Sequence, residues 1–435
     1  MDDEFYWELI DGVIRMHTYE LDKNKAPTGE GTRIHLEDTT RQAQIRGFLD
    51  GLDVNMTRAF LPWIIRNPRY LRTFTLFRRI YEDSKRLRAE HAKRSLVVPP
   101  FMIISITSKC NLRCRGCYAS ANGTVSESTN SSQLDREQWR KVLSQARELG
   151  VLGFIIAGGE PFMFPDLIEL CSEYSDRFFV IVTNGTSITE ADYARLRKST
   201  NIGVVVSLEG GRSATDARRG EGVYVRAMNS IRRLLKTGVF SGVSVTVTKR
   251  NLDYWMDEAN IDAVTDLGIK FGVFIEYIPD TPSTANSLGG GCPSQSEFLV
   301  DVDGANKEGD DLTLSPDEQR VFRRRILEYR SSKPIYIIHS PADEEYFGGC
   351  VSAGRGFVHV TPTGDLTPCP VSNIATHNLS TSTLREGLSS PLFSRLRESD
   401  ILKSGHTSSC ALVSHRKEVE EIARSVDSDR YGARK

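Results

Sequence analysis

Six short apolar runs, separated by helix-length segments, fill the middle of the chain between residues 99 and 280. Each run is continuous rather than alternating in polarity, which is typical of parallel strands buried on both faces. The segments between the runs have the amphipathic spacing of helices, as in Asp135–Leu149 and Tyr224–Thr237. The pattern predicts an α/β fold: a partial (β/α)6 barrel of the TIM type with an open sheet.

The sequence on either side of this barrel has a different pattern. Residues 1–98 have helical spacing and end in consecutive prolines, so they are expected to form a helical N-terminal extension. Residues 281–334 are expected to hold a linker loop and a helix that begins at Pro316, with Ser315 as its N-cap. Residues 335–435 combine glycine and proline turns with short strands and helices, which predicts a small α+β C-terminal domain.

The composition is that of a folded globular protein. The 435 residues carry a net charge of -1 and are 39% hydrophobic, unlike a disordered chain. No apolar run reaches the ~18–20 residues needed to span a bilayer, and the acidic start has no apolar secretion signal. Eight cysteines in such a chain indicate metal or redox chemistry rather than disulfides. We therefore expect a cytoplasmic protein.

Three of the cysteines directly follow the first predicted strand, in the sequence SITSKCNLRCRGCYAS. Cys110, Cys114 and Cys117 would lie at the carboxyl end of the sheet, where barrel enzymes hold their catalytic residues. Structural zinc usually takes four ligands, and no second cysteine pair lies nearby in the sequence. The loop is also too polar for a group of inert buried thiols. Three thiolates suit a 4Fe–4S cluster that leaves one iron open to another ligand.

The Cys-x3-Cys-x2-Cys spacing, followed by GGEP, TNG and SLEGG after the next three strands, resembles the radical S-adenosylmethionine (radical SAM) superfamily. The resemblance covers about residues 100–280 and implies that the open iron binds S-adenosylmethionine (AdoMet). It further implies that the reduced cluster cleaves AdoMet and that the 5′-deoxyadenosyl radical so formed abstracts hydrogen from a substrate. The AdoMet-binding residues that it implies are Tyr118, Gly158, Gly159, Glu160, Pro161, Asn184, Ser207 and Arg219.

The resemblance leaves the substrate open among a peptide, a lipid and a small metabolite. The resemblance does not say whether AdoMet is consumed or regenerated. It does imply that an external protein such as flavodoxin or ferredoxin donates the electron. The alternative is an iron–sulfur electron carrier or redox sensor without AdoMet chemistry. Such a protein needs neither the GGEP sequence nor a six-stranded barrel, so the sequence favours the enzyme.

A second group of cysteines lies near the C-terminus. Cys350 and Cys369 flank a predicted hairpin with a Pro-Thr-Gly turn, and Cys410 follows. The arrangement resembles the SPASM and twitch modules of the same superfamily, which implies an auxiliary 4Fe–4S cluster; structural zinc or free thiols are the alternatives. A cluster ordinarily takes four ligands. Either Cys292 completes the set or one iron stays open, and we favour the open iron.

Residues 53–95 are strongly basic, with eleven Lys and Arg against four Asp and Glu. Aromatic residues recur on one face of the helix expected there, and basic residues occupy the rest. The pattern favours a helix that packs on the barrel through its aromatic face. Peripheral membrane contact or an anionic substrate is the alternative. Nucleic acid is not expected as a partner, because the whole chain is nearly neutral and carries no nucleic-acid-binding signature.

Overall fold

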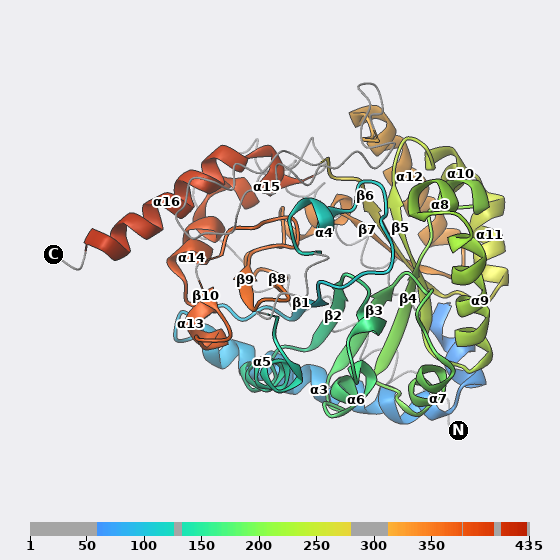
Figure 1. The fold of residues 1–435 in the computed structure, drawn as a ribbon, viewed down its shortest axis with the longest axis horizontal. Helices are drawn as coiled ribbons and strands as arrows, with labels where there is room; N and C mark the ends of the chain where they lie inside the picture. The colour runs from blue at the N-terminus through green and yellow to red at the C-terminus, as the bar shows by residue number, and fades with distance from the viewer. Residues whose placement is uncertain (1–58, 126–132, 280–311, 376, 404–409, 433–435) are drawn as a thin grey trace, which may run out of the picture.

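The computed structural model describes residues 59–125, 133–279, 312–375, 377–403 and 410–432. Its centre is one curved ten-stranded sheet in the order β10-β9-β8-β1-β2-β3-β4-β5-β6-β7 (Figure 1). Every pair from β8 to β7 in that order is parallel, whereas the two pairs that β9 forms are antiparallel. The α/β class is therefore confirmed, and the order has two ends, as in a partial barrel.

The six strands predicted from apolar runs all form, because each run is long enough to be buried between helices and the barrel interior. Their bounds are β1 (Phe101–Thr107), β2 (Gly153–Gly158), β3 (Phe178–Thr183), β4 (Ile202–Ser207), β5 (Ser241–Val247) and β6 (Phe271–Glu276). Residues that face the outer helices, such as Ile104, Phe179 and Val204, are almost completely buried. The hydrophobic core lies between the sheet and this helical layer.

The helices between these strands cover the outside of the sheet (Figure 1). The N-cap Asp135 begins the first of them in a reciprocal capping box with Gln138, and Gly150 ends it with a left-handed φ of 95°. The bounds are α5 (Arg136–Leu149), α6 (Leu167–Ser172), α7 (Glu190–Lys198), α8 (Arg212–Arg219), α9 (Val223–Lys236), α10 (Leu252–Met256) and α11 (Glu258–Asp266).

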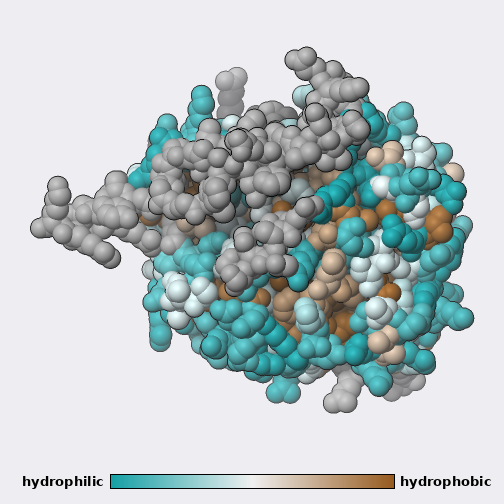
Figure 2. All heavy atoms as spheres, viewed as in Figure 1, coloured by the Kyte–Doolittle hydropathy of each residue, from teal (hydrophilic) through white to brown (hydrophobic). Residues whose placement is uncertain are grey.

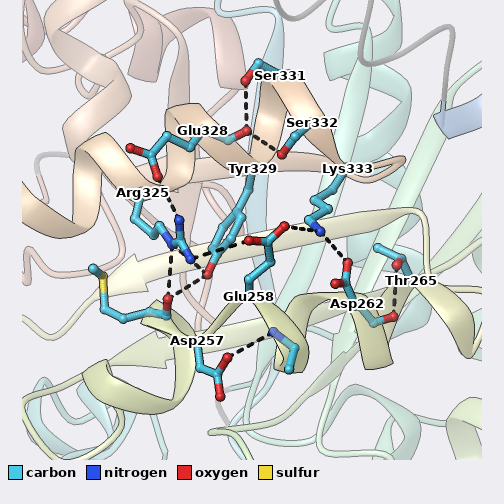
Figure 3. A network of polar contacts seen from close by, with 12 residues as sticks. Asp257, Glu258, Asp262, Thr265, Arg325, Glu328, Tyr329, Ser331, Ser332 and Lys333 are labelled. Carbon is cyan, nitrogen blue, oxygen red and sulfur yellow. Dashed lines mark hydrogen bonds and ion pairs between the residues drawn. The ribbon is translucent and has the colours of Figure 1, made fainter.

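A seventh parallel strand, β7 (Tyr336–Ser340), pairs with β6 and was not part of the predicted barrel. It follows α12 (Pro316–Ser332), which begins at Pro316 with Ser315 as N-cap, as expected. Figure 3 shows how α12 is fixed to α11 and the end of α10. The Tyr329 hydroxyl donates to the Trp255 carbonyl at 3.0 Å, and the Lys333 ammonium lies 2.7 Å from Asp262.

The predicted hairpin near the C-terminus is confirmed as β8 (Phe357–Val360) and β9 (Asp365–Thr367). The sequence did not reveal that β8 would pair in parallel with β1 and so continue the barrel sheet. The remaining elements at this end are β10 (His377–Asn378), α13 (Leu384–Leu388), α14 (Pro391–Glu398), α15 (Ala411–Ser414) and α16 (Arg416–Gly432). The central sheet thus includes strands from both sides of residue 335, where the C-terminal domain was expected to begin. The division of the chain into four domains or segments stays a prediction.

Helix α3 (Arg69–Ala92) packs along the barrel through its aromatic face. The Tyr70 hydroxyl accepts a 3.1 Å hydrogen bond from the Phe240 amide, and the Arg69 guanidinium donates to the carbonyls of Thr237 and Gly238. Residues 59–66 form a further helical segment, from which Trp63 packs on Tyr70 with ring centroids 4.5 Å apart. These contacts favour the packed helix. No helix among the described residues is long and apolar enough to cross a membrane.

Candidate active site

The three clustered cysteines lie in the loop that leaves the carboxyl end of β1. Cys117 is the N-cap of the short helix α4 (Tyr118–Ala121), and the Leu112 amide contacts the Cys110 sulfur at 3.5 Å. All three thiols are partly exposed and free of disulfides. Burial raises the pKa of Cys110 to about 11. Burial also raises the pKa of Cys114, although the charges of two nearby arginines oppose that rise.

The loop after β2 is bound directly to the start of the cysteine loop. The Gly159 amide donates to the Thr107 carbonyl at 2.8 Å, and the Glu160 amide donates to the Lys109 carbonyl at 2.8 Å. A Cβ atom at Gly159 would lie only 2.1 Å from that Lys109 oxygen. Glycine is therefore required at position 159 for the two backbones to approach, which explains the second glycine of GGEP.

Glu160 holds this loop in place through its buried side chain. Its carboxylate accepts hydrogen bonds from the Thr183 hydroxyl at 2.6 Å, the Asn184 amide at 2.8 Å and the Phe162 amide at 3.2 Å. Burial raises the pKa of Glu160, and these three donors partly offset the effect. The Asn184 side chain in turn donates to Asn111 of the cysteine loop at 2.9 Å. Glu160 thus connects the ends of β2 and β3 to the cysteine loop.

A buried ion-pair group, missed in the sequence, lies against the other side of the cysteine loop. Glu209 is 1% exposed and accepts from the guanidinium groups of Arg218 at 2.6 Å and Arg219 at 2.7 Å. Burial alone would raise the pKa of Glu209, but the two arginine charges outweigh it and hold that pKa below its usual value. Arg218 also donates to the Gly116 carbonyl at 3.2 Å. The one sequence feature that could have indicated this ion pair is the acidic residue of SLEGG, which is Glu209.

Glu209 carries one polar atom that remains unsatisfied. Its Oε2 is buried and has no hydrogen-bond partner among the residues that the structure describes. Arg219 and Arg218 also act electrostatically on Cys114, so the ion-pair group and the thiols share one region. A buried acceptor without a donor is costly in a closed protein interior, and a bound polar ligand could supply the donor.

The residues implied as AdoMet contacts surround the cysteine loop on several strand ends. Gly158 to Pro161 follow β2, Asn184 follows β3, and Ser207 ends β4 as a buried residue. Pro161 begins a short 3-10 helix, and Tyr118 is 39% exposed at the start of α4. The structure brings these residues to one edge of the sheet, and their contacts with AdoMet stay a prediction.

The three C-terminal cysteines also converge, although they come from three separate segments. Cys350 and Cys410 are buried and Cys369 is partly buried. Burial raises the pKa of Cys350 to about 12, and burial together with the charges of the other two thiols raises that of Cys369. The Ala353 amide donates to the Pro368 carbonyl at 3.1 Å, which fixes the first segment to the second.

Within the described residues, no three cysteine, histidine or acidic side chains are close enough together to hold a single metal ion. The ligands of a 4Fe–4S cluster stand further apart than those of one ion, because the cluster itself separates them. Cys292, the alternative fourth ligand, lies outside the described residues.

The sequence of this chain is similar to those of known proteins. The Radical SAM superfamily matches residues 104–260. Fe-coproporphyrin III synthase of Methanosarcina barkeri is 30% identical over 189 residues, which are 42% of this chain and 45% of that protein. PqqA peptide cyclase of Gluconobacter oxydans is 26% identical over 316 residues, which are 70% of this chain and 81% of that protein. The chain thus spans less than half of the first relative and most of the second.

Among solved structures, Streptococcus suis SuiB bound to precursor peptide SuiA has a similar fold. The TM-score is 0.56 at 18% sequence identity, and the alignment covers 73% of this chain and 71% of SuiB. At that identity, the likeness shows a shared fold. It agrees with the largely parallel sheet of this chain.

Proposed function

The chain belongs to the radical SAM superfamily, and from this premise we propose that it is an enzyme that modifies a peptide by hydrogen abstraction. The observation that carries the proposal is the junction between two loops. The Gly159 and Glu160 amides bind the carbonyls that lead into the Cys110, Cys114 and Cys117 loop. This places the thiols beside the residues implied to bind AdoMet. An electron carrier without AdoMet chemistry would not need that junction.

The residues present fit a 4Fe–4S cluster. Three free thiols share one loop and are partly exposed, and the positive charges of Arg219 and Arg218 favour the thiolate form of Cys114. When bound there, the cluster supplies the electron that cleaves AdoMet to the 5′-deoxyadenosyl radical, which takes hydrogen from the substrate.

The chain's own residues orient the AdoMet molecule. Glu160 is a positioning residue, because its carboxylate is already occupied by donors from β3 and from its own loop. The Glu209 Oε2 atom has no hydrogen-bond partner among the described residues, so it can accept a hydrogen bond from a bound ligand. Arg219 lies beside it. In keeping with the family resemblance, we assign Ser207 and Arg219 to the ribose or the carboxylate of AdoMet and Tyr118 to its adenine.

The inner face of the sheet supports a substrate with apolar side chains. Phe274 points outward, since its ring packs on Trp255 at 5.0 Å, so its neighbour Ile275 points to the inner face. Ile275 and Ile338, on the adjoining strands β6 and β7, are 38% and 37% exposed. Figure 2 shows hydrophobic residues in the middle of this face of the molecule. A peptide side chain could cover such a surface.

The names of the relatives also favour a peptide, because the match to the peptide cyclase runs across most of the chain. The match to the porphyrin enzyme runs across 42% of it. The electron would come from a donor such as flavodoxin or ferredoxin, and the exposed Lys109 and Arg113 on the cysteine loop would attract an acidic donor surface. An auxiliary 4Fe–4S cluster is assigned to Cys350, Cys369 and Cys410.

Isotope transfer tests the peptide proposal. Reduced, reconstituted protein is mixed with AdoMet and with uniformly deuterated forms of any short peptides that are found to be encoded beside its gene. We expect deuterium in 5′-deoxyadenosine and a matching mass change in one peptide. If only a deuterated porphyrin passes its label to 5′-deoxyadenosine, the peptide proposal is wrong.

A further inference from the structure

The short helix α4 begins at one cysteine site and ends at the other. Its N-cap is Cys117, the last cysteine of the loop after β1, and its C-cap is Asn122. The Asn122 side-chain amide donates a 2.5 Å hydrogen bond to the carbonyl of Pro370, which directly follows Cys369 in the sequence. One turn of helix thus joins the cysteine loop after β1 to the C-terminal cysteine site.

The orientation of the Asn122 amide is fixed by its second contact. Its Oδ1 atom accepts a hydrogen bond from the Thr124 amide at 3.0 Å. The NH2 group is therefore the part of the side chain that faces the Pro370 carbonyl, which can only accept. The bond between the two cysteine sites thus requires a donor on this side chain.

Helix α4 is too short to be stable by itself. It has four residues, and the first turn of a helix costs more conformational entropy than its few hydrogen bonds return. Ala119 is its one buried residue. Among the described residues, the other hydrogen bonds of residues 117–125 stay within that segment, as from the Val125 amide to the Ala119 carbonyl at 2.8 Å. The order of α4 therefore depends on what holds its two ends.

The segment around Cys369 is fixed more firmly than α4. The Cys369 carbonyl accepts from the Thr367 hydroxyl at 3.2 Å and from the Ser372 amide at 3.0 Å. Thr367 also contacts His359 at 2.9 Å, and His359 contacts Ser105 on β1 at 2.8 Å. Because β1 is paired on both sides, with β2 and β8, these contacts connect Cys369 to the centre of the sheet. A shift between the two cysteine sites would thus be taken up by α4.

We propose that Asn122 is a positioning residue that couples the two iron–sulfur sites. This rests on the auxiliary cluster of the proposed function. A cluster bound at Cys369 fixes the Pro370 carbonyl, which holds Asn122, and α4 then keeps Cys117 in place for the cluster on the loop after β1, the main cluster. The two sites share the entropy cost of ordering α4, so the presence of the auxiliary cluster stabilises the main cluster.

The test compares four reconstituted proteins by how fast they lose the main cluster. They are the wild type, Asn122→Asp, a triple variant with alanine at the three C-terminal cysteines (Cys350, Cys369 and Cys410), and the triple variant that also carries Asn122→Asp. Aspartate has the shape of asparagine and can still accept from Thr124, but when ionised it has no donor for Pro370. A ferrous chelator removes iron without oxygen, and the main cluster is followed by the change that AdoMet causes in its electron paramagnetic resonance spectrum.

The matched control is Asn260→Asp. The Asn260 amide also donates to a backbone carbonyl, that of Tyr254 at 2.8 Å, but it lies on α11 in the outer helical layer. This variant should lose its main cluster at the rate of the wild type.

We expect about eight irons in the wild type and about four in the triple variant. The triple variant and Asn122→Asp should each lose the main cluster at least about five times faster than the wild type, a modest coupling between two sites. Adding Asn122→Asp to the triple variant should cause no further change, because the partner site is then already empty.

Three results would overturn the coupling while both clusters remain established. These are an unchanged rate in Asn122→Asp, an unchanged rate in the triple variant, and a further acceleration when the two changes are combined. A wild type with only about four irons would overturn the auxiliary cluster and the coupling together. The deuterium transfer described above judges the peptide-modifying function separately.

Discussion

The Thr183 hydroxyl donates a 2.6 Å hydrogen bond to Oε1 of Glu160, so the end of β3 fixes the loop that follows β2. Glu160 is fully buried, and a buried carboxylate must be satisfied by donors if it is to remain charged. The same loop donates two backbone hydrogen bonds to the start of the cysteine loop. The position of the thiols therefore depends on contacts made two strands away.

Replacement of Gly159 by alanine should remove the main cluster. The added Cβ would lie 2.1 Å from the Lys109 carbonyl, so the two loops would have to separate. We expect the variant to lose about four irons after reconstitution and to be destabilised by about 1–3 kcal/mol, as in other overpacked sites. Iron analysis and urea unfolding provide the measurement.

The matched control is Gly211→Ala, in the loop after β4. Gly211 has an ordinary φ of -65°, and a Cβ there would lie 3.4 Å from the Tyr254 ring, a normal contact distance. It should retain its iron. Equal iron contents in the two variants would show that the close approach at Gly159 does not support the cysteine loop.

Removal of the Glu209 carboxylate should lower the free energy of unfolding far more than removal of an exposed carboxylate. Glu209→Ala would leave the largely buried side chains of Arg218 and Arg219 beside each other without their shared partner. Breaking a buried ion pair in this way typically costs about 3–5 kcal/mol in the free energy of unfolding. Glu169→Ala removes an exposed pair with Arg195, and we expect a loss of at most about 1 kcal/mol. Urea unfolding of both variants makes the comparison, and similar losses would contradict the account.

His359 should make the fold sensitive to mild acid. Its ring bridges β1 and β9, with contacts of 2.8 Å to Ser105 and 2.9 Å to Thr367, and burial lowers its pKa to about 3. Between pH 6.5 and 3 the unfolded chain binds a proton at this residue that the folded chain does not. Stability therefore falls as the pH falls through that window, and rises again with pH.

Between pH 6.5 and pH 5, this histidine alone should cost about 1.5 kcal/mol in the free energy of unfolding. His359→Gln can keep hydrogen bonds to both partners but cannot take up a charge. Over the same pH range, the unfolding free energy of this variant should therefore fall by about 1.5 kcal/mol less than that of the wild type. Identical pH profiles for the wild type and the variant would show that His359 does not stay neutral in the fold.

The strands and their order along the barrel were predictable from the sequence, because each is a local apolar run. The bounds of β1 match the predicted run FMIISIT residue by residue. The pairing of β8 with β1 was not predictable, since it joins residues more than 250 positions apart and depends on the final packing. A strand of four residues carries too little pattern to identify its partner.

The site was predictable where the functional residues are close together in the sequence, as in the cysteine loop and GGEP. It was not predictable where the partner comes from a different element. Glu209 finds its arginines only because α8 turns back on the end of β4. The guanidinium of Arg69, at the start of the basic helix, binds backbone carbonyls of the barrel, and the sequence pattern did not indicate this contact. Both contacts follow from tertiary packing.

Formation of 5′-deoxyadenosine from AdoMet tests the central claim most directly. Reconstituted, reduced wild type is compared with the variant in which Cys110, Cys114 and Cys117 are all alanine, and the product is measured by chromatography. The account predicts product from the wild type and none above background from the variant, which should still hold about four irons at its second site. Equal product from both proteins would contradict it.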